Sequence, residues 1–172
     1  MADATKLLIT NNILRFDQSQ PWDAWRQKEL YTCEVNDLMD PNIPGLKKVY
    51  DKYLEPRKKH MDQRDAISLF REETNLIHQE ADVMYCFGMS KMTCILESKD
   101  SERQNSQLQF VEFLEMIGRV AHFKYRGDQD FAKTALAVRI ELILDEVLAT
   151  VDVKRKDPEQ IQLDESESDD DY

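Results

Sequence analysis

Apolar residues recur at intervals of three and four along most of the chain, and no segment shows sustained alternation of apolar and polar residues. The first spacing is typical of amphipathic helices, whereas the second would indicate strands. The pattern therefore predicts an all-α protein. A helix is expected over residues 22–39, with Pro21 in its first turn, and the prolines at 41 and 44 are expected to end it.

The segment that follows has a more specific pattern. One helical stripe carries Leu46, Val49, Tyr50 and Tyr53, a polar gap holds the lone apolar residue Met61, and a second stripe surrounds Asp65, Ile67, Leu69 and Phe70. This helix–loop–helix order resembles an EF-hand. In that motif the apolar residue at loop position 8 pairs as a short strand with its sister loop. Placing Met61 there makes Leu54 position 1 and Asp65 position 12.

A calcium-binding loop needs oxygen donors at positions 1, 3, 5 and 12, and a glycine at position 6 for the sharp turn. In the first loop, positions 1, 3, 5 and 6 are Leu54, Pro56, Lys58 and Lys59. Arg57 and His60 add further positive charge where a dication would lie. The first loop is therefore expected to keep the scaffold without the calcium site.

A second unit of the same kind is predicted around residues 101–112. Residues 78–92 form its expected entering helix, Leu108 takes position 8, and Glu112 takes position 12. Ser101 and Asn105 at positions 1 and 5 are weak donors, and no glycine stands at position 6. If this loop binds calcium, the ligands are Ser101, Asn105 and Glu112. We interpret Glu112 instead as an exposed acid at a helix start, favoured by the helix dipole.

Met61 and Leu108 lie farther apart in the chain than the same positions of two adjacent EF-hands usually do. An insertion is expected between them. Residues 68–78 could extend the exiting helix of the first unit and supply a linker, and residues 97–107 could widen the second loop.

Two later stripes predict core residues. Phe110, Phe113, Leu114 and Ile117 follow helical spacing on one face. The last expected helix has an apolar stripe that must be covered. The cover could be the two helical units of the same chain or another protein, and we favour the same chain, the cis arrangement. That stripe consists of Leu136, Ile140, Ile143, Leu144, Val147 and Val151, widened by Leu142 and Leu148.

The combined motifs resemble a known type of domain. The runs WDAWRQKELY, LKKVYDKY, CFGMSKMT, LQFVEFLEMIGRVAHFKY and VRIELILDEVL, between residues 22 and 150, are similar to a degenerate EF-hand-like domain of ciliary and flagellar proteins. The resemblance implies a noncatalytic domain without a cofactor, in contact with other proteins of an axonemal, microtubule-based assembly. The expected location is the cytoplasm, in a cilium or flagellum.

Charge and composition limit the other possibilities. The net charge is −11, but residues 157–172 alone hold eight acids and no base, so the remainder stands at −3. Without a basic excess, neither nucleic acid nor an anionic membrane is an expected partner. The chain has three cysteines, no secretion-signal pattern and only four glycines, and it carries no local motif of a nucleophilic enzyme. Reduced thiols and a nonenzymatic role are therefore expected.

The predicted organisation has three parts. Residues 1–20 form an arm or short helix, residues 21–156 an EF-hand-like helical domain with packing helices at both ends, and residues 157–172 an acidic disordered tail. Ser166 and Ser168 in the tail are candidate phosphorylation sites because acids follow them. The favoured function is a structural or adaptor protein of a ciliary assembly. The alternatives are a calcium-responsive regulator that binds a target helix, and a nonciliary cytoplasmic scaffold.

Overall fold

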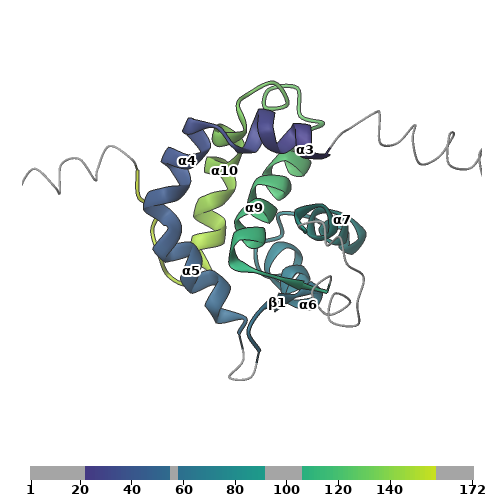
Figure 1. Cartoon of the computed structure of the whole chain (residues 1–172), viewed down its shortest axis with the longest axis vertical. Coiled ribbons are helices and arrows are strands. Elements are labelled where there is room, and N and C mark those ends of the chain that lie inside the picture. Colours follow the sequence, from purple (N-terminus) through teal and green to yellow (C-terminus); the bar gives the residue numbers. More distant parts are fainter. Residues whose placement is uncertain (1–21, 55–57, 92–105, 158–172) are drawn as a thin grey trace, which may run out of the picture. The chain divides into compact units, whose positions relative to one another are not determined.

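The computed structural model describes residues 22–54, 58–91 and 106–157, and these are mostly helical with one small two-stranded sheet (Figure 1). This confirms the all-α class. The predicted arm at 1–20, the tail after residue 157 and the candidate phosphorylation sites Ser166 and Ser168 lie outside the described residues. None of the described helices is long and apolar enough to cross a membrane.

The described residues belong to two compact units, divided after Thr32. In the first unit, α3 (Trp22–Trp25) runs directly into the π-helix η2 (Arg26–Leu30). The continuous helix predicted over 22–39 is wrong, because the chain leaves helical geometry at Tyr31 and Thr32. Tyr31 donates its backbone N–H to Arg26 O at 2.8 Å, the wide turn of a π-helix. Tyr31 and the next two residues all have weak helix propensity, which favours a break here.

The second unit begins with α4 (Cys33–Met39), the 3-10 turn η3 (Asp40–Asn42) and α5 (Ile43–Lys52). Pro41 and Pro44 were expected to end a helix, but each stands in the first turn of a new one. A proline is tolerated there because the first N–H groups of a helix have no partner within it. The chain therefore stays helical from α4 to α5.

Together with α5, the rest of this unit forms two helix–strand–helix segments and adds a last helix. The elements are β1 (Met61–Asp62), α6 (Gln63–Ile67), the π-helix η4 (Ser68–Glu73), α7 (Glu80–Ser90), β2 (Gln107–Leu108), α9 (Phe110–Tyr125) and α10 (Leu136–Ala149). Residues 68–78 do extend the first exiting helix and supply a linker, as the sequence predicted.

The strands β1 and β2 pair antiparallel, with Met61 opposite Leu108 and Asp62 opposite Gln107. This is the register that placing Met61 and Leu108 at position 8 predicts. Both side chains are fully buried. The Tyr50 hydroxyl donates to Leu108 O at 2.7 Å, so α5 is tied to the second strand as well.

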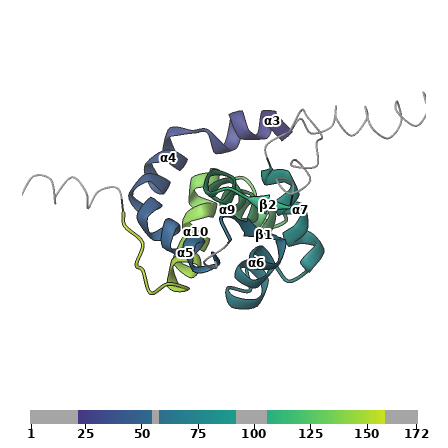
Figure 2. The ribbon, with the colours of Figure 1, turned by 60° about the horizontal axis from the view of Figure 1, so that its bottom comes forward.

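Helix α10 packs within the same unit. It contacts α9, α5 and α4, and both views place it beside α9 and α5 (Figures 1 and 2). The cis arrangement favoured from the sequence is therefore present. Most of the predicted stripe is buried, but Leu142 is 39% exposed because it faces away from these helices, and Val151 is only half-buried.

The core joins the two segments. Phe113 and Ile117 on α9 are fully buried, while Phe110 and Leu114 are half-buried, so the predicted face is correct and its edges are partly exposed. The Phe113 ring lies 5.6 Å from that of Tyr50 and 6.5 Å from that of Phe70. Aromatic rings at these separations contribute beyond their area burial. One side chain from α9 thus contacts helices before and after the first loop.

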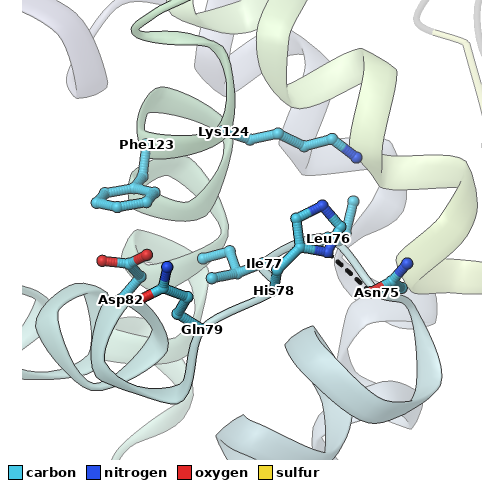
Figure 3. Close-up of a pocket in the computed structure, with 8 residues that line it drawn as sticks. All are labelled: Asn75, Leu76, Ile77, His78, Gln79, Asp82, Phe123 and Lys124. Carbon is cyan, nitrogen blue, oxygen red and sulfur yellow. Dashed lines mark hydrogen bonds between the residues drawn. The ribbon is translucent and has the colours of Figure 1, made fainter.

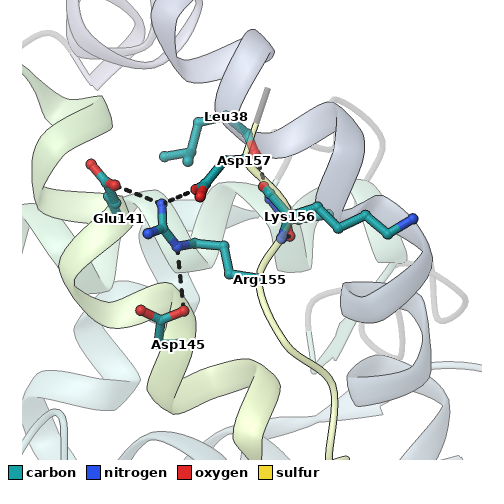
Figure 4. Close-up of polar contacts among 7 residues, drawn as sticks. Leu38, Glu141, Asp145, Arg155, Lys156 and Asp157 are labelled. Carbon is teal, nitrogen blue, oxygen red and sulfur yellow. Dashed lines mark hydrogen bonds and ion pairs between the residues drawn. The ribbon is translucent and has the colours of Figure 1, made fainter. Parts of the chain in front are cut away.

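Residues after α10 return across η3 and α5. Asn42 donates from Nδ2 to Lys156 O at 2.9 Å and accepts from Lys156 N at 2.8 Å. The Arg155 guanidinium lies 2.6 Å from Glu141 and 2.9 Å from Asp157 (Figure 4). A Cβ added at Gly45 would meet Leu148 at 2.8 Å and Val153 at 3.0 Å. A larger residue at position 45 would force the Leu148 or Val153 side chain to shift where α5 approaches α10 and the returning segment.

Candidate functional site

The two loops that flank the paired strands carry the candidate site residues. In the first loop, Lys58 Nζ lies 2.9 Å from Asp62 Oδ2 and also contacts Asp65 Oδ2. The two acids also form a capping box at the start of α6, in which Asp62 N donates to Asp65 Oδ2 at 2.7 Å and Asp65 N donates to Asp62 Oδ1 at 3.2 Å. One lysine therefore bridges both acids of a helix start.

These contacts perturb the titration of the first loop. Burial alone would raise the pKa of Asp62, but hydrogen bonds from Lys58 and from the Asp65 backbone lower it on balance. Burial alone would lower the pKa of Lys58, but its hydrogen bonds to Asp65 and Asp62 raise it on balance. Both shifts favour the charged pair. The loop thus holds an ammonium ion between carboxylates at neutral pH.

The second loop has a related arrangement with a different donor. Lys91, which follows the last residue of α7, places Nζ 2.7 Å from Glu112 Oε2 and also donates to Gln107 O. Gln109 N donates to Glu112 Oε2 at 2.8 Å, within a second capping box. The prediction that Glu112 is an exposed acid is wrong: the residue is 5% exposed, although it does stand at the start of a helix.

Ser101 and Asn105, the other conditional calcium ligands, lie outside the described residues. Within the described ranges, no group of three or more His, Cys, Asp or Glu side chains is arranged to hold a metal ion. Sequence reasoning recognised the positive charge of Lys58 in the first loop. It missed Lys91, which lies ten residues before the second loop; the only available signal was a lysine at the predicted end of the entering helix.

A pocket of about 320 Å³ lies apart from these loops, between the linker, the start of α7 and the end of α9 (Figure 3). Its lining residues are Asn75, Leu76, Ile77, His78, Gln79, Asp82, Phe123 and Lys124. The ring nitrogen Nδ1 of His78 lies 3.1 Å from Asn75 Oδ1. The lining also includes the charged side chains of Asp82 and Lys124.

The two described cysteines have different surroundings. Cys33 is exposed, whereas Cys86 is buried in α7. Burial raises the pKa of the Cys86 thiol to about 12, although the nearby Arg119 opposes this shift. A thiol with so high a pKa is a poor nucleophile and a poor metal ligand at neutral pH.

An aromatic group with a cation is present on the surface near the pocket. Tyr85 on α7 is 47% exposed, and its ring lies 6.1 Å from that of Phe123 on α9. The Arg126 guanidinium lies 3.8 Å from the centre of the Phe123 ring, a cation–π distance. We call these three residues the Tyr85 surface.

Comparison of the chain with protein-family models, with curated proteins and with solved structures finds no match.

Proposed function

We propose that this protein is a noncatalytic structural or adaptor protein built on a degenerate pair of EF-hand-like units. The observation that carries the proposal is the pairing of β1 with β2 in the register Met61 to Leu108. In this interpretation α5 and α6 flank the first loop, and α7 and α9 flank the second. Tyr50 of the first EF-hand-like unit contacts Leu108 and Phe113 of the second. Each EF-hand-like unit therefore covers apolar surface of the other.

The loops favour a static module over a calcium-responsive regulator. A regulator of this type needs loop oxygens that are available to a divalent ion. Here the position-12 carboxylates of Asp65 and Glu112 are each paired with a lysine ammonium. In addition, α10 occupies part of the helical surface that a target helix would need. Both features support a role that is constant across calcium concentrations.

Protein contacts would then use exposed side chains rather than an opened groove. The Tyr85 surface has the composition that dominates binding energy in protein interfaces, where tyrosine and arginine are enriched. We propose it as a contact surface for a partner protein. The resemblance to ciliary domains extends the proposal to a microtubule-based assembly of a cilium or flagellum, in which that partner is a neighbouring protein.

Localisation and binding can be tested together. A tagged copy is expressed in a ciliated cell, and its axonemal fraction is compared with that of Tyr85→Ala and Arg126→Ala variants. We expect the unmodified protein in the axonemal fraction and the variants depleted from it, with unchanged melting temperatures. A matched control is Leu142→Ser on α10, which removes another exposed apolar side chain. Uniform cytoplasmic distribution of the unmodified protein would contradict the ciliary role.

Calcium independence has its own test. Isothermal titration of the full chain with calcium should give no micromolar binding isotherm, since Leu54 and Lys58 cannot ligate and Glu112 is paired. A micromolar heat signal that Glu112→Gln abolishes would favour the regulator instead.

A further inference from the structure

The paired strands fix which loop residues correspond to cation ligands. With Met61 and Leu108 both at position 8, Asp62 and Asp65 are positions 9 and 12 of the first loop. Gln107 and Glu112 are positions 7 and 12 of the second loop. In a working EF-hand, position 7 ligates through its backbone carbonyl, position 9 often through a water, and position 12 through its carboxylate. These are the oxygens that the two lysines contact.

In the first loop the ammonium of Lys58 contacts the carboxylates at positions 9 and 12. Lys58 itself is position 5, where a calcium loop supplies an oxygen donor. The side chain thus replaces one ligand and places its positive charge against two others.

In the second loop the ammonium of Lys91 contacts the backbone carbonyl at position 7 and the carboxylate at position 12. These oxygens lie on the two sides of Leu108, and one cation joins them. The side chains of Lys91 and Glu112 are 14% and 6% exposed, so this contact is shielded from water. It differs in this way from Lys47 and Asp51, an exposed pair within one helix.

We propose that the ammonium groups of Lys58 and Lys91 take the place of the two divalent cations, so that each loop carries a permanent cation of its own. This inference rests on the EF-hand-like interpretation of the proposed function. It adds that the loops are held in a cation-occupied arrangement at all calcium concentrations. An ammonium has three donors and no acceptor, which suits a cluster of carboxylate and carbonyl oxygens.

The stability arm of the test uses Lys91→Met and Lys58→Met, which keep an unbranched side chain and remove the charge. The matched control is Lys47→Met. Breaking a buried pair leaves a charge without its partner, so Lys91→Met should lower the melting temperature by about 10 °C, and Lys47→Met should change it little. The double variant Lys91→Met with Glu112→Gln should recover part of the loss. Equal effects of Lys91→Met and Lys47→Met would overturn the proposal.

The cation arm measures whether the vacated position accepts a divalent ion. Melting temperatures of the full chain and the variants are compared in calcium chloride at roughly 10 mM, above the range of weak EF-hand sites, and in sodium chloride of equal ionic strength. We expect calcium to stabilise Lys91→Met and Lys58→Met more than the unmodified chain. In the double variant Lys91→Met with Glu112→Gln, calcium should not raise the melting temperature more than it does in the unmodified chain.

The possible outcomes distinguish failure of the lysine inference from failure of the proposed adaptor function. If calcium stabilises neither lysine variant, the lysines are ordinary ion-pair partners and the inference fails, while the calcium-independent adaptor stands. If the unmodified chain binds micromolar calcium, the proposed function fails with it. Should Lys91→Met not fold, Lys58→Met answers the question at the first loop, where the pair is more exposed.

Discussion

The two loops reach similar arrangements from different parts of the sequence. In the first loop the ammonium comes from Lys58 within the loop itself, and both of its carboxylate partners lie in the following helix start. In the second, Lys91 arrives from the end of the preceding helix and joins a strand carbonyl to Glu112. The first contact is local, whereas the second links α7, β2 and α9.

The difference in burial follows from this connectivity. Side-chain exposure is 22% for Lys58 and 16% for Asp65, against 14% for Lys91 and 6% for Glu112. An ion pair that is shielded from water has stronger coupling and a larger penalty when one partner is removed. We therefore expect the second loop to carry more of the stability than the first.

The largest effect is expected from Phe113→Ala on α9, the exiting helix of the second loop. Phe113 is fully buried and contacts Tyr50 and Phe70, so its removal leaves a cavity between the two segments. The free energy of unfolding should fall by about 3–5 kcal/mol in chemical denaturation. Val111→Ala, on the exposed side of the same helix, is the control and should change it by less than about 0.5 kcal/mol. An unchanged stability together with a lost partner contact would mean that the Phe113 face is an interface.

A smaller effect should distinguish the two loops directly. Glu112→Gln and Asp65→Asn each remove the charge of an acid that accepts a backbone N–H in a capping box. Glu112→Gln should cost about 1–3 kcal/mol because the acid is buried and its lysine is largely shielded from water, and Asp65→Asn about 1 kcal/mol or less. Urea denaturation of both variants measures the difference. A larger cost for Asp65→Asn would reverse the comparison.

The pH dependence of the first loop should be smaller still. The pKa of Asp62 is lowered in the folded state, so its contribution to stability is present above its unfolded pKa of about 3.9 and is lost as pH falls through the folded value. The pKa of Lys58 is raised, so its contribution is complete below about pH 10.4 and is lost as pH rises through the folded value.

The stability difference between the unmodified chain and Lys58→Met should therefore be a plateau between these limits and decline on both sides. Its height should not exceed about 1 kcal/mol, because the pair is partly exposed. Thermal unfolding followed by circular dichroism across pH gives the profile. A difference that stays constant below pH 3 would contradict the assignment to Asp62.

The sequence predicted the pairing of the two loops through β1 and β2 better than it predicted the helix boundaries between residues 22 and 39. Met61 stood out as a lone apolar residue in polar surroundings, and Leu108 was placed by its spacing to Phe110 and Glu112. Aligning the two residues predicted the observed strand register. The break at Tyr31 was missed, although the weak helix propensity of Tyr31 and of the two residues that follow it was a local signal. Lys91 was missed for a different reason: its partners are defined by the folded loop, and no local spacing links residue 91 to residue 112.

The last prediction concerns the acidic tail, for which the smallest effect is expected. The final contacts of the described chain are made by Arg155, Lys156 and Asp157. Lys156 fastens the returning segment to η3 and Arg155 fastens it to α10 (Figure 4). A chain that ends at Asp157 keeps these three residues and should melt like the full-length protein.

A chain that ends at Asp152 is the matched comparison, since it also removes Val153 from beside Gly45 and Leu148. It should melt several degrees lower, because the hydrogen bonds of buried Asn42 to Lys156 are lost with it. Neither deletion removes Lys58 or Lys91. The ratio between the losses of melting temperature caused by Lys58→Met and by Lys91→Met should therefore be the same in both truncated chains as in the full chain. A lower melting temperature after removal of residues 158–172 alone would show that the acidic segment contributes to folding, and its interpretation as a disordered tail would be wrong.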